Sequence, residues 1–224
     1  MVVFSQVALL ISFVAIGYIL NKLKIVEAQH GKFLSALLVN VFLPFNLLKS
    51  FSANFTVAYL SSNYALVLTS LVILAVTAVG AYFGSKLFTK VPYEQKLFEY
   101  SLTVTNSGYM GYPLIESMLG TIGLTNFAVF GIPVTLFTYS YGYAILTKNR
   151  LSLRKLLNPI TVAMFIGIVI GLTGIPVPGM VSEVLSKGSG CLGPISMILT
   201  GIVVAEYKIK DILSDARVYV MTVL

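Results

Sequence analysis

Asn106, Ser107, Gly108 and Pro113 form a group that could bind an anion inside an apolar segment. Asn106 offers amide donors, and Ser107 offers a hydroxyl group. Proline is favoured at the first position of a helix, where free N–H groups and the positive end of the helix dipole attract negative charge. These residue types at this spacing therefore predict recognition of a small anion, such as a carboxylate.

The apolar segment that holds these residues covers positions 97–119 and is long enough to cross a bilayer as a helix. Its two glycines and its proline are poor choices for a helix interior. Gly108 suits the end of a helix, and Pro113 suits the start of the next. We therefore expect a broken helix whose first half ends near positions 106–107. Unpaired backbone at membrane depth is tolerated beside protein or a watery cavity, so the break predicts a binding cavity.

A plain proline kink would also explain Pro113 by itself, because proline and glycine are common in membrane helices. The density of helix breakers and the polar side chains beside them favour a substrate site. Interhelical hydrogen bonding is the competing role, and it is favoured for Ser107 but not for Asn106. The candidate substrate-binding residues are Asn106, Ser107, Gly108, Tyr109, Gly111, Pro113 and Asn46.

Two further apolar segments contain prolines that could act as kinks beside the site. Pro44 and Asn46 interrupt the second segment, and Pro194 interrupts the seventh, so we expect all three to flank the crossover at mid-depth. Glu116 would lie in the first turn of the second half-helix, where capping is its expected role and proton relay the alternative. No lysine or arginine is expected at mid-span. The candidate crossover and hinge residues are Pro44, Pro194, Gly108 and Pro113.

Composition places the whole chain in a lipid bilayer. Of its 224 residues, 57% are hydrophobic and 10% are charged, and the mean hydropathy is +0.92. The net charge of +7 comes from basic residues in short loops, where they orient helices, so nucleic acid is not an expected partner. A single cysteine, Cys191, excludes an intrachain disulfide. His30 has no partners for a metal site, and we expect neither a metal nor a cofactor.

Apolar windows of about 16 to 22 residues recur along the chain, each bounded by charged or turn residues. The 15 basic residues lie in the odd-numbered loops except for Lys49 and Lys187. The positive-inside rule therefore predicts a multi-pass protein of the plasma membrane with its N-terminus outside and its odd loops in the cytoplasm. The expected spans are 3–20, 33–51, 64–83, 97–119, 126–146, 160–175 and 190–205, and an eighth begins at position 218.

An internal repeat is visible at a shift of 150 positions, which superposes Gly17 on Gly167 and Pro44 on Pro194. Five spans separate the two copies, so the copies would have opposite orientations in the membrane, as in many secondary transporters. The segment after position 217 gives roughly 10 Å of helix, too short for a bilayer core of about 30 Å, and we expect a truncated chain. The two repeats would cover residues 1–150 and, incompletely, residues 151–224.

Three segments resemble the auxin efflux carrier family of membrane transport proteins: positions 40–48, 106–114 and 156–162. The likeness covers essentially the whole chain, and the broken segment is its most specific part. The resemblance implies ten spans in two inverted five-helix repeats, with the fourth and ninth helices broken and crossing at the substrate site. It also implies a homodimer that carries small organic anions, such as auxin in plants and malate in bacteria. The chain departs from this pattern by lacking most of the eighth helix and all of the last two.

We therefore predict an all-α integral membrane protein with the inverted-repeat transporter fold and a broken crossover helix. Its expected function is that of a permease or efflux carrier, a secondary transporter that moves a small organic anion by alternating access. The crossover would move against a scaffold built partly from spans one, two, six and seven.

The coupling ion could be H⁺ or Na⁺, because no nucleotide-binding motif for ATP is present. The competing hypothesis is a truncated membrane protein that does not transport and acts as a partner or sensor. An enzyme is not expected, since the serine-hydrolase, zinc-protease and paired-aspartate motifs are absent.

Overall fold

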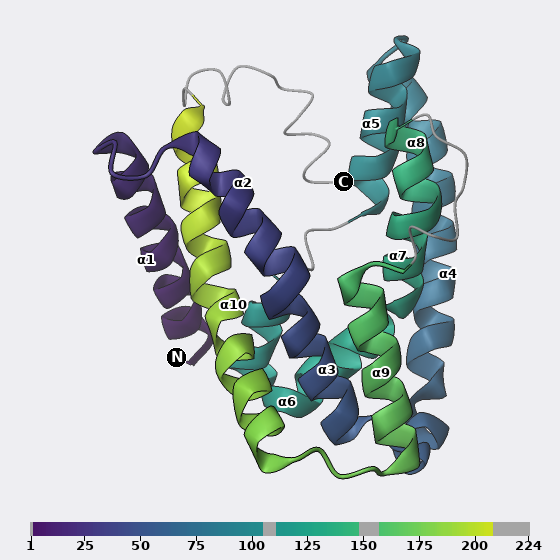
Figure 1. The fold of residues 1–224 in the computed structure, drawn as a ribbon. Helices are drawn as coiled ribbons and strands as arrows, with labels where there is room; N and C mark the ends of the chain where they lie inside the picture. Colours follow the sequence, from purple (N-terminus) through teal and green to yellow (C-terminus); the bar gives the residue numbers. More distant parts are fainter. Residues whose placement is uncertain (1, 105–110, 148–156, 208–224) are drawn as a thin grey trace. The chain divides into compact units, whose positions relative to one another are not determined.

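The computed structural model describes residues 2–104, 111–147 and 157–207, and of residues 2, 3, 28, 113, 117, 143 and 147 it describes the backbone alone. These described residues form helices and no strand (Figure 1), which confirms the predicted all-α class. The helices are α1 Val2–Lys22, α2 Ala28–Leu37, η1 Leu38–Phe42, α3 Leu43–Asn54, α4 Val57–Phe88, α5 Pro92–Thr103, α6 Tyr112–Phe130, α7 Ile132–Phe137, η3 Thr138–Gly142, α8 Tyr143–Thr147, α9 Pro159–Thr173 and α10 Gly179–Glu206.

Several of these helices are long and apolar enough to cross a membrane. Within the described residues they number four, and a fifth is obtained if two helices bent by 46° are counted as one span. α9 is apolar but has 15 residues. The findings confirm an integral membrane protein of several spans. The four are Phe4–Lys22, Gln29–Asn54, Val57–Phe88 and Gly179–Glu206, and the bent pair is Met118–Phe130 with Ile132–Leu146.

Some predicted span boundaries are wrong. α4 has 32 residues and α10 begins at Gly179, so both helices are longer than their apolar windows. In α10 the first turns are extended by polar residues, among them Glu183 and Lys187, which pair at i,i+4 spacing and support helix outside an apolar environment. Asn126, the predicted first residue of the fifth span, lies inside α6 and not at the start of a helix. The helical segment that contains Asn126 begins after Gly120, whose φ of 65° and ψ of −164° interrupt α6.

Pro44 does not end the second span, because α2, η1 and α3 follow one another without a gap from Ala28 to Asn54. A π-helical turn over Leu38–Phe42 comes directly before α3, and Pro44 lies at the start of α3. A π-turn of this kind is a common way to absorb a helix irregularity beside a proline. Pro194 likewise lies inside the continuous helix α10. The hinge role of both prolines stays a prediction.

The chain divides into two compact units. The first contains residues 1–62, 106–128 and 159–208, and so includes α1, α2, α3, most of α6, α9 and α10. The second contains residues 63–105, 129–158 and 209–224, with most of α4 and with α5, α7 and α8. The first unit thus gathers the helices that correspond to predicted spans one, two, six and seven. The division into two sequence repeats, residues 1–150 and 151–224, stays a prediction.

Close helix contacts at glycines hold the first unit together. α1 packs along α10, and α3 packs along α9 (Figure 1). A Cβ atom at Gly17 would lie 2.1 Å from the carbonyl oxygen of Ile198, and one at Gly201 would lie 2.0 Å from that of Val14. Small residues of this kind let membrane helices approach backbone to backbone.

The second unit is held together by a different set of contacts. α5 packs against α8, and the Tyr141 hydroxyl lies 3.4 Å from a carboxylate oxygen of Glu99. Ser70 in α4 donates a hydrogen bond to the carbonyl oxygen of Phe130. In α4 many apolar side chains are exposed, as expected for a helix in contact with lipid.

Candidate substrate site

Four of the candidate substrate-binding residues, Asn106, Ser107, Gly108 and Tyr109, lie outside the described residues. The helices on either side of them are described. α5 ends at Thr103, and Val104 has an extended backbone with φ of −105° and ψ of 110°. α6 begins at Tyr112. Positions 97–119 therefore do not form one continuous helix, and the predicted break is confirmed. The first half ends earlier than expected, in agreement with the low helix preference of the β-branched residues Thr103 and Val104.

The second half-helix is bounded at both ends. Gly111 comes directly before α6, and Pro113 is the second residue of α6, within one position of its predicted place. Gly120 then interrupts the helix after position 119. The buried side chain of Tyr112 packs edge-on against Phe127, with ring centroids 5.2 Å apart. This contact fixes the start of the half-helix against its continuation.

A polar cluster forms where this half-helix meets α3 and α10. Asn46 is completely buried, and its Nδ2 donates hydrogen bonds to Glu116 Oε2 at 3.1 Å and to Ser189 Oγ at 2.8 Å. Lys49 Nζ lies 3.6 Å from Glu116 Oε1. The expectation that Glu116 serves as a helix cap is wrong, because its carboxylate is engaged by α3. We call Asn46, Lys49, Glu116 and Ser189 the acid–lysine cluster.

Lys49 brings a basic side chain to Glu116, although it lies near the end of its span and not at mid-span. It lies one helical turn after Asn46, so both side chains project from the same face of α3. Its side chain is 26% exposed, and that of Glu116 is 27% exposed. An ion pair with this much burial is screened less by water than a surface pair. The sequence did hold a signal, since Lys49 breaks the regular loop pattern of the basic residues.

Two further polar residues on the same face of α3 form hydrogen bonds with α6. Ser50 Oγ lies 2.9 Å from Thr125 Oγ1, and Asn54 Nδ2 donates to Thr125 Oγ1 at 2.9 Å. Asn46, Ser50 and Asn54 are spaced by four residues, which places them in one row along the helix. This row attaches the continuation of α6 to α3 by polar contacts within an apolar bundle.

A cavity of about 200 Å³ opens beside Glu116. That volume is room for several water molecules, each of which takes about 30 Å³ in the liquid. Pro194 has no N–H to donate to the carbonyl of Gly190, so the wall includes a backbone acceptor that lacks its usual helical partner. The cavity is lined by Gln6, Leu9, Leu10, Glu116, Ser189, Gly190, Gly193 and Pro194.

Asn46 carries an unused hydrogen-bonding group. Among the described residues, its Oδ1 is a buried side-chain acceptor without a hydrogen-bond partner. Leaving such a group unpaired costs about 1–3 kcal/mol, so an unpaired acceptor beside a carboxylate and a cavity points to function. The structure thus brings Asn46 together with Glu116, while Pro44 and Pro194 lie in the same two helices that bear Asn46 and Ser189.

Comparison with known proteins identifies the family of the chain. A family model described as membrane transport protein matches residues 2–152 of the chain. An uncharacterized transporter of Methanothermobacter thermautotrophicus is 26% identical over 215 residues, which covers 91% of this chain and 68% of that protein. The four described helices that are long and apolar enough to cross a membrane fit these matches. The chain therefore belongs to the auxin efflux carrier family of membrane transport proteins.

Proposed function

We propose that this protein is a secondary transporter that moves a small organic anion, such as a carboxylate, across the cytoplasmic membrane by alternating access. Membership of a transport family supports this function. The observation that carries the proposal is the interruption of the fourth span between Thr103 and Tyr112. An interrupted span presents backbone groups to a solute at membrane depth, as the broken helices of transporters do.

Charge compensation for the anion has two sources in this proposal. The first turn of α6 offers free N–H groups and the positive end of its dipole. Lys49, one turn beyond Asn46 on α3, offers an ammonium group that is paired with Glu116 in the structure. Asn106 would add a directional hydrogen bond through its amide. Together these groups favour an organic anion over a cation or a neutral solute.

Packing inside the first unit supports the inverted repeat on which alternating access depends. A Cβ atom at Gly17 would meet the backbone of Ile198, and one at Gly167 would lie 3.2 Å from the carbonyl oxygen of Leu48. Gly167 and Ile198 follow Gly17 and Leu48 by the same 150 positions. The contact of α1 with α10 is thus repeated by the contact of α9 with α3, as a pair of inverted repeats requires.

Uptake into liposomes tests the function. Full-length protein is reconstituted and supplied with radiolabelled carboxylates, including malate, and we expect saturable uptake. Asn106→Ala should lower that uptake at least tenfold at unchanged protein yield. Asn40→Ala serves as the matched control, because Asn40 is exposed and its Nδ2 bonds to the carbonyl of Ala36 in its own helix.

The same experiment distinguishes a transporter from a non-transporting partner or sensor. A full-length protein that folds and binds no carboxylate would favour the non-transporting partner or sensor. Uptake that is the same in Asn106→Ala and in wild type would remove Asn106 from the site and leave the transporter standing. The location in the plasma membrane, the outside N-terminus and the homodimer belong to the same proposal and follow from the charge pattern and the family resemblance.

A further inference from the structure

We infer that Glu116 is the proton-binding site of the transport cycle, and that its protonation transfers Lys49 from Glu116 to the transported anion. In this inference Asn46 serves both states of Glu116. The role of the anion depends on the proposed function. The assignment of Glu116 as the proton site does not depend on the proposed function, so an experiment can refute either one without the other.

The ion pair between Lys49 and Glu116 is long and partly exposed, so it can separate. The 3.6 Å between Lys49 Nζ and Glu116 Oε1 is longer than a usual hydrogen bond, so the pair is held mainly by charge. Both side chains are about a quarter exposed, which lets water and a solute reach them. Removing one charge from a partly buried pair leaves the other uncompensated. Protonation of Glu116 would therefore create a positive charge on Lys49 that a carboxylate could neutralise.

Asn46 can bind Glu116 in either protonation state. In the structure its Nδ2 donates to Glu116 Oε2, which is the arrangement suited to a carboxylate. Its Oδ1 is buried and, within the described part of the chain, has no hydrogen-bond partner. A protonated Glu116 carries an O–H donor, and an unused amide oxygen on the neighbouring residue is an acceptor for it. A carboxylate with a purely structural role would not need this second group.

The cavity supplies the path for the proton. Glu116 lines it together with Gln6 and Ser189, whose polar side chains can hold water against the carboxylate. These two residues carry no charge, so α1 and α10 contribute no ion to this wall. Glu116 is the sole charged residue of α6. Among the described residues, the charged side chain within ion-pair distance of it is Lys49, from α3.

The proton balance is simple. A proton from cavity water forms an O–H bond on a Glu116 carboxylate oxygen, and Lys49 keeps its own proton throughout. The ammonium of Lys49 then pairs with the carboxylate of the solute. On release of the solute, Glu116 returns its proton to water and pairs with Lys49 again. One proton therefore accompanies each carboxylate that Lys49 binds, and the loaded cluster carries the same net charge as the empty one.

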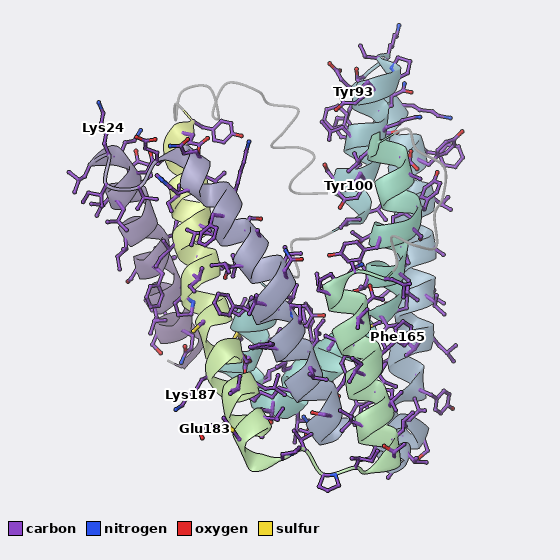
Figure 2. The ribbon with its side chains drawn as sticks, in the orientation of Figure 1. Lys24, Tyr93, Tyr100, Phe165, Glu183 and Lys187 are labelled. Carbon is purple, nitrogen blue, oxygen red and sulfur yellow. The ribbon has the colours of Figure 1, made fainter. Side chains whose placement is uncertain are left out.

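Infrared difference spectroscopy of the purified full-length protein tests the proton site without any solute. On lowering the pH, wild type should show the carbonyl band of one protonated carboxyl group that Glu116→Gln lacks. Glu183→Gln is the matched control, since Glu183 forms an exposed pair with Lys187 at 2.8 Å on α10 (Figure 2) and its loss should leave that band unchanged. Identical spectra for wild type and Glu116→Gln would overturn the inference.

Transport in liposomes tests the coupling, with radiolabelled malate as the solute and an internal pH-sensitive dye. Wild type should carry protons inward together with malate. Glu116→Gln should lose at least nine-tenths of the proton flux and the acid stimulation of malate uptake. Lys49→Met should raise the KM for malate at least tenfold. Proton flux and KM unchanged in both variants would refute the coupling, whereas no malate uptake by wild type would count against the proposed substrate and leave the infrared result to judge the proton site.

Discussion

Replacing Gly201 with alanine tests how the first unit is packed. The added Cβ would lie 2.0 Å from the carbonyl oxygen of Val14 and 2.8 Å from the amide nitrogen of Tyr18. Both are backbone atoms, so no side-chain rotation can relieve the overlap. To reach an ordinary contact of about 3.4 Å, α1 and α10 would have to separate by more than an ångström. The variant therefore forces a shift of a whole helix.

The magnitude follows from two opposing effects. Overpacking of this kind costs typically 1–3 kcal/mol, and contact with rigid backbone places Gly201→Ala toward the upper end. Alanine recovers about 1 kcal/mol over glycine in a helix interior. We expect a net loss of about 1–2 kcal/mol in the free energy of unfolding, which corresponds to a fall of several degrees in Tm for a chain of this size.

Thermal unfolding of the detergent-purified protein measures this loss, with Gly190→Ala as the control. Gly190 lies in the same helix and a Cβ there would meet nothing within 4 Å, so its variant should be as stable as wild type or slightly more so. Gly167→Ala, at the position of the repeat equivalent to Gly17, should also be destabilised, because its Cβ would lie 2.8 Å from Phe51 Cβ. Equal Tm values for Gly201→Ala and Gly190→Ala would refute the packing argument.

Three other variants probe single contacts. Thr125→Val removes the hydroxyl shared by Ser50 and Asn54 and should lower the free energy of unfolding by about 1–3 kcal/mol; a Tm equal to that of wild type would show that these bonds do not attach α6. Lys22→Met removes a charged donor 2.8 Å from a carbonyl oxygen in the last turn of α10 and should cost about 1.5–3 kcal/mol in the same measurement. Pro113→Ala should reduce anion uptake severalfold by favouring helix upstream of α6, and an undiminished rate would support the plain proline kink.

Hydropathy was sufficient to predict the all-α membrane class and the approximate place of the four described helices that are long enough to cross a membrane. It failed at span ends, because α4 and α10 continue into segments whose polar residues make local contacts, such as the Ser61 hydrogen bond in α4 and the Glu183–Lys187 pair in α10. The predicted end of the fourth span at position 119 agrees with the interruption at Gly120, but helix resumes directly after this glycine and not at the predicted position 126. Such interruptions depend on the tertiary environment of the backbone.

The acid–lysine cluster shows what sequence could not provide. Asn46 and Glu116 were both candidates, but 70 positions separate them in the chain, and no spacing rule pairs them. In the charge pattern Lys49 is one of two basic residues that lie outside the odd-numbered loops. The π-turn comes directly before α3, and Pro44 lies at the start of α3, so both precede Lys49. Contacts of this kind follow from how α3, α6 and α10 pack, which one sequence does not reveal.

Gly120 has a consequence for how mutations in this gene would be tolerated. A Cβ atom added there would meet nothing within 4 Å, yet its φ of 65° and ψ of −164° belong to a region of backbone conformation that is essentially restricted to glycine. A saturation scan should thus find almost every amino acid rejected at a position where volume imposes no limit, with small and large side chains penalised alike. At Gly17 or Gly201, by contrast, the penalty should grow with side-chain bulk.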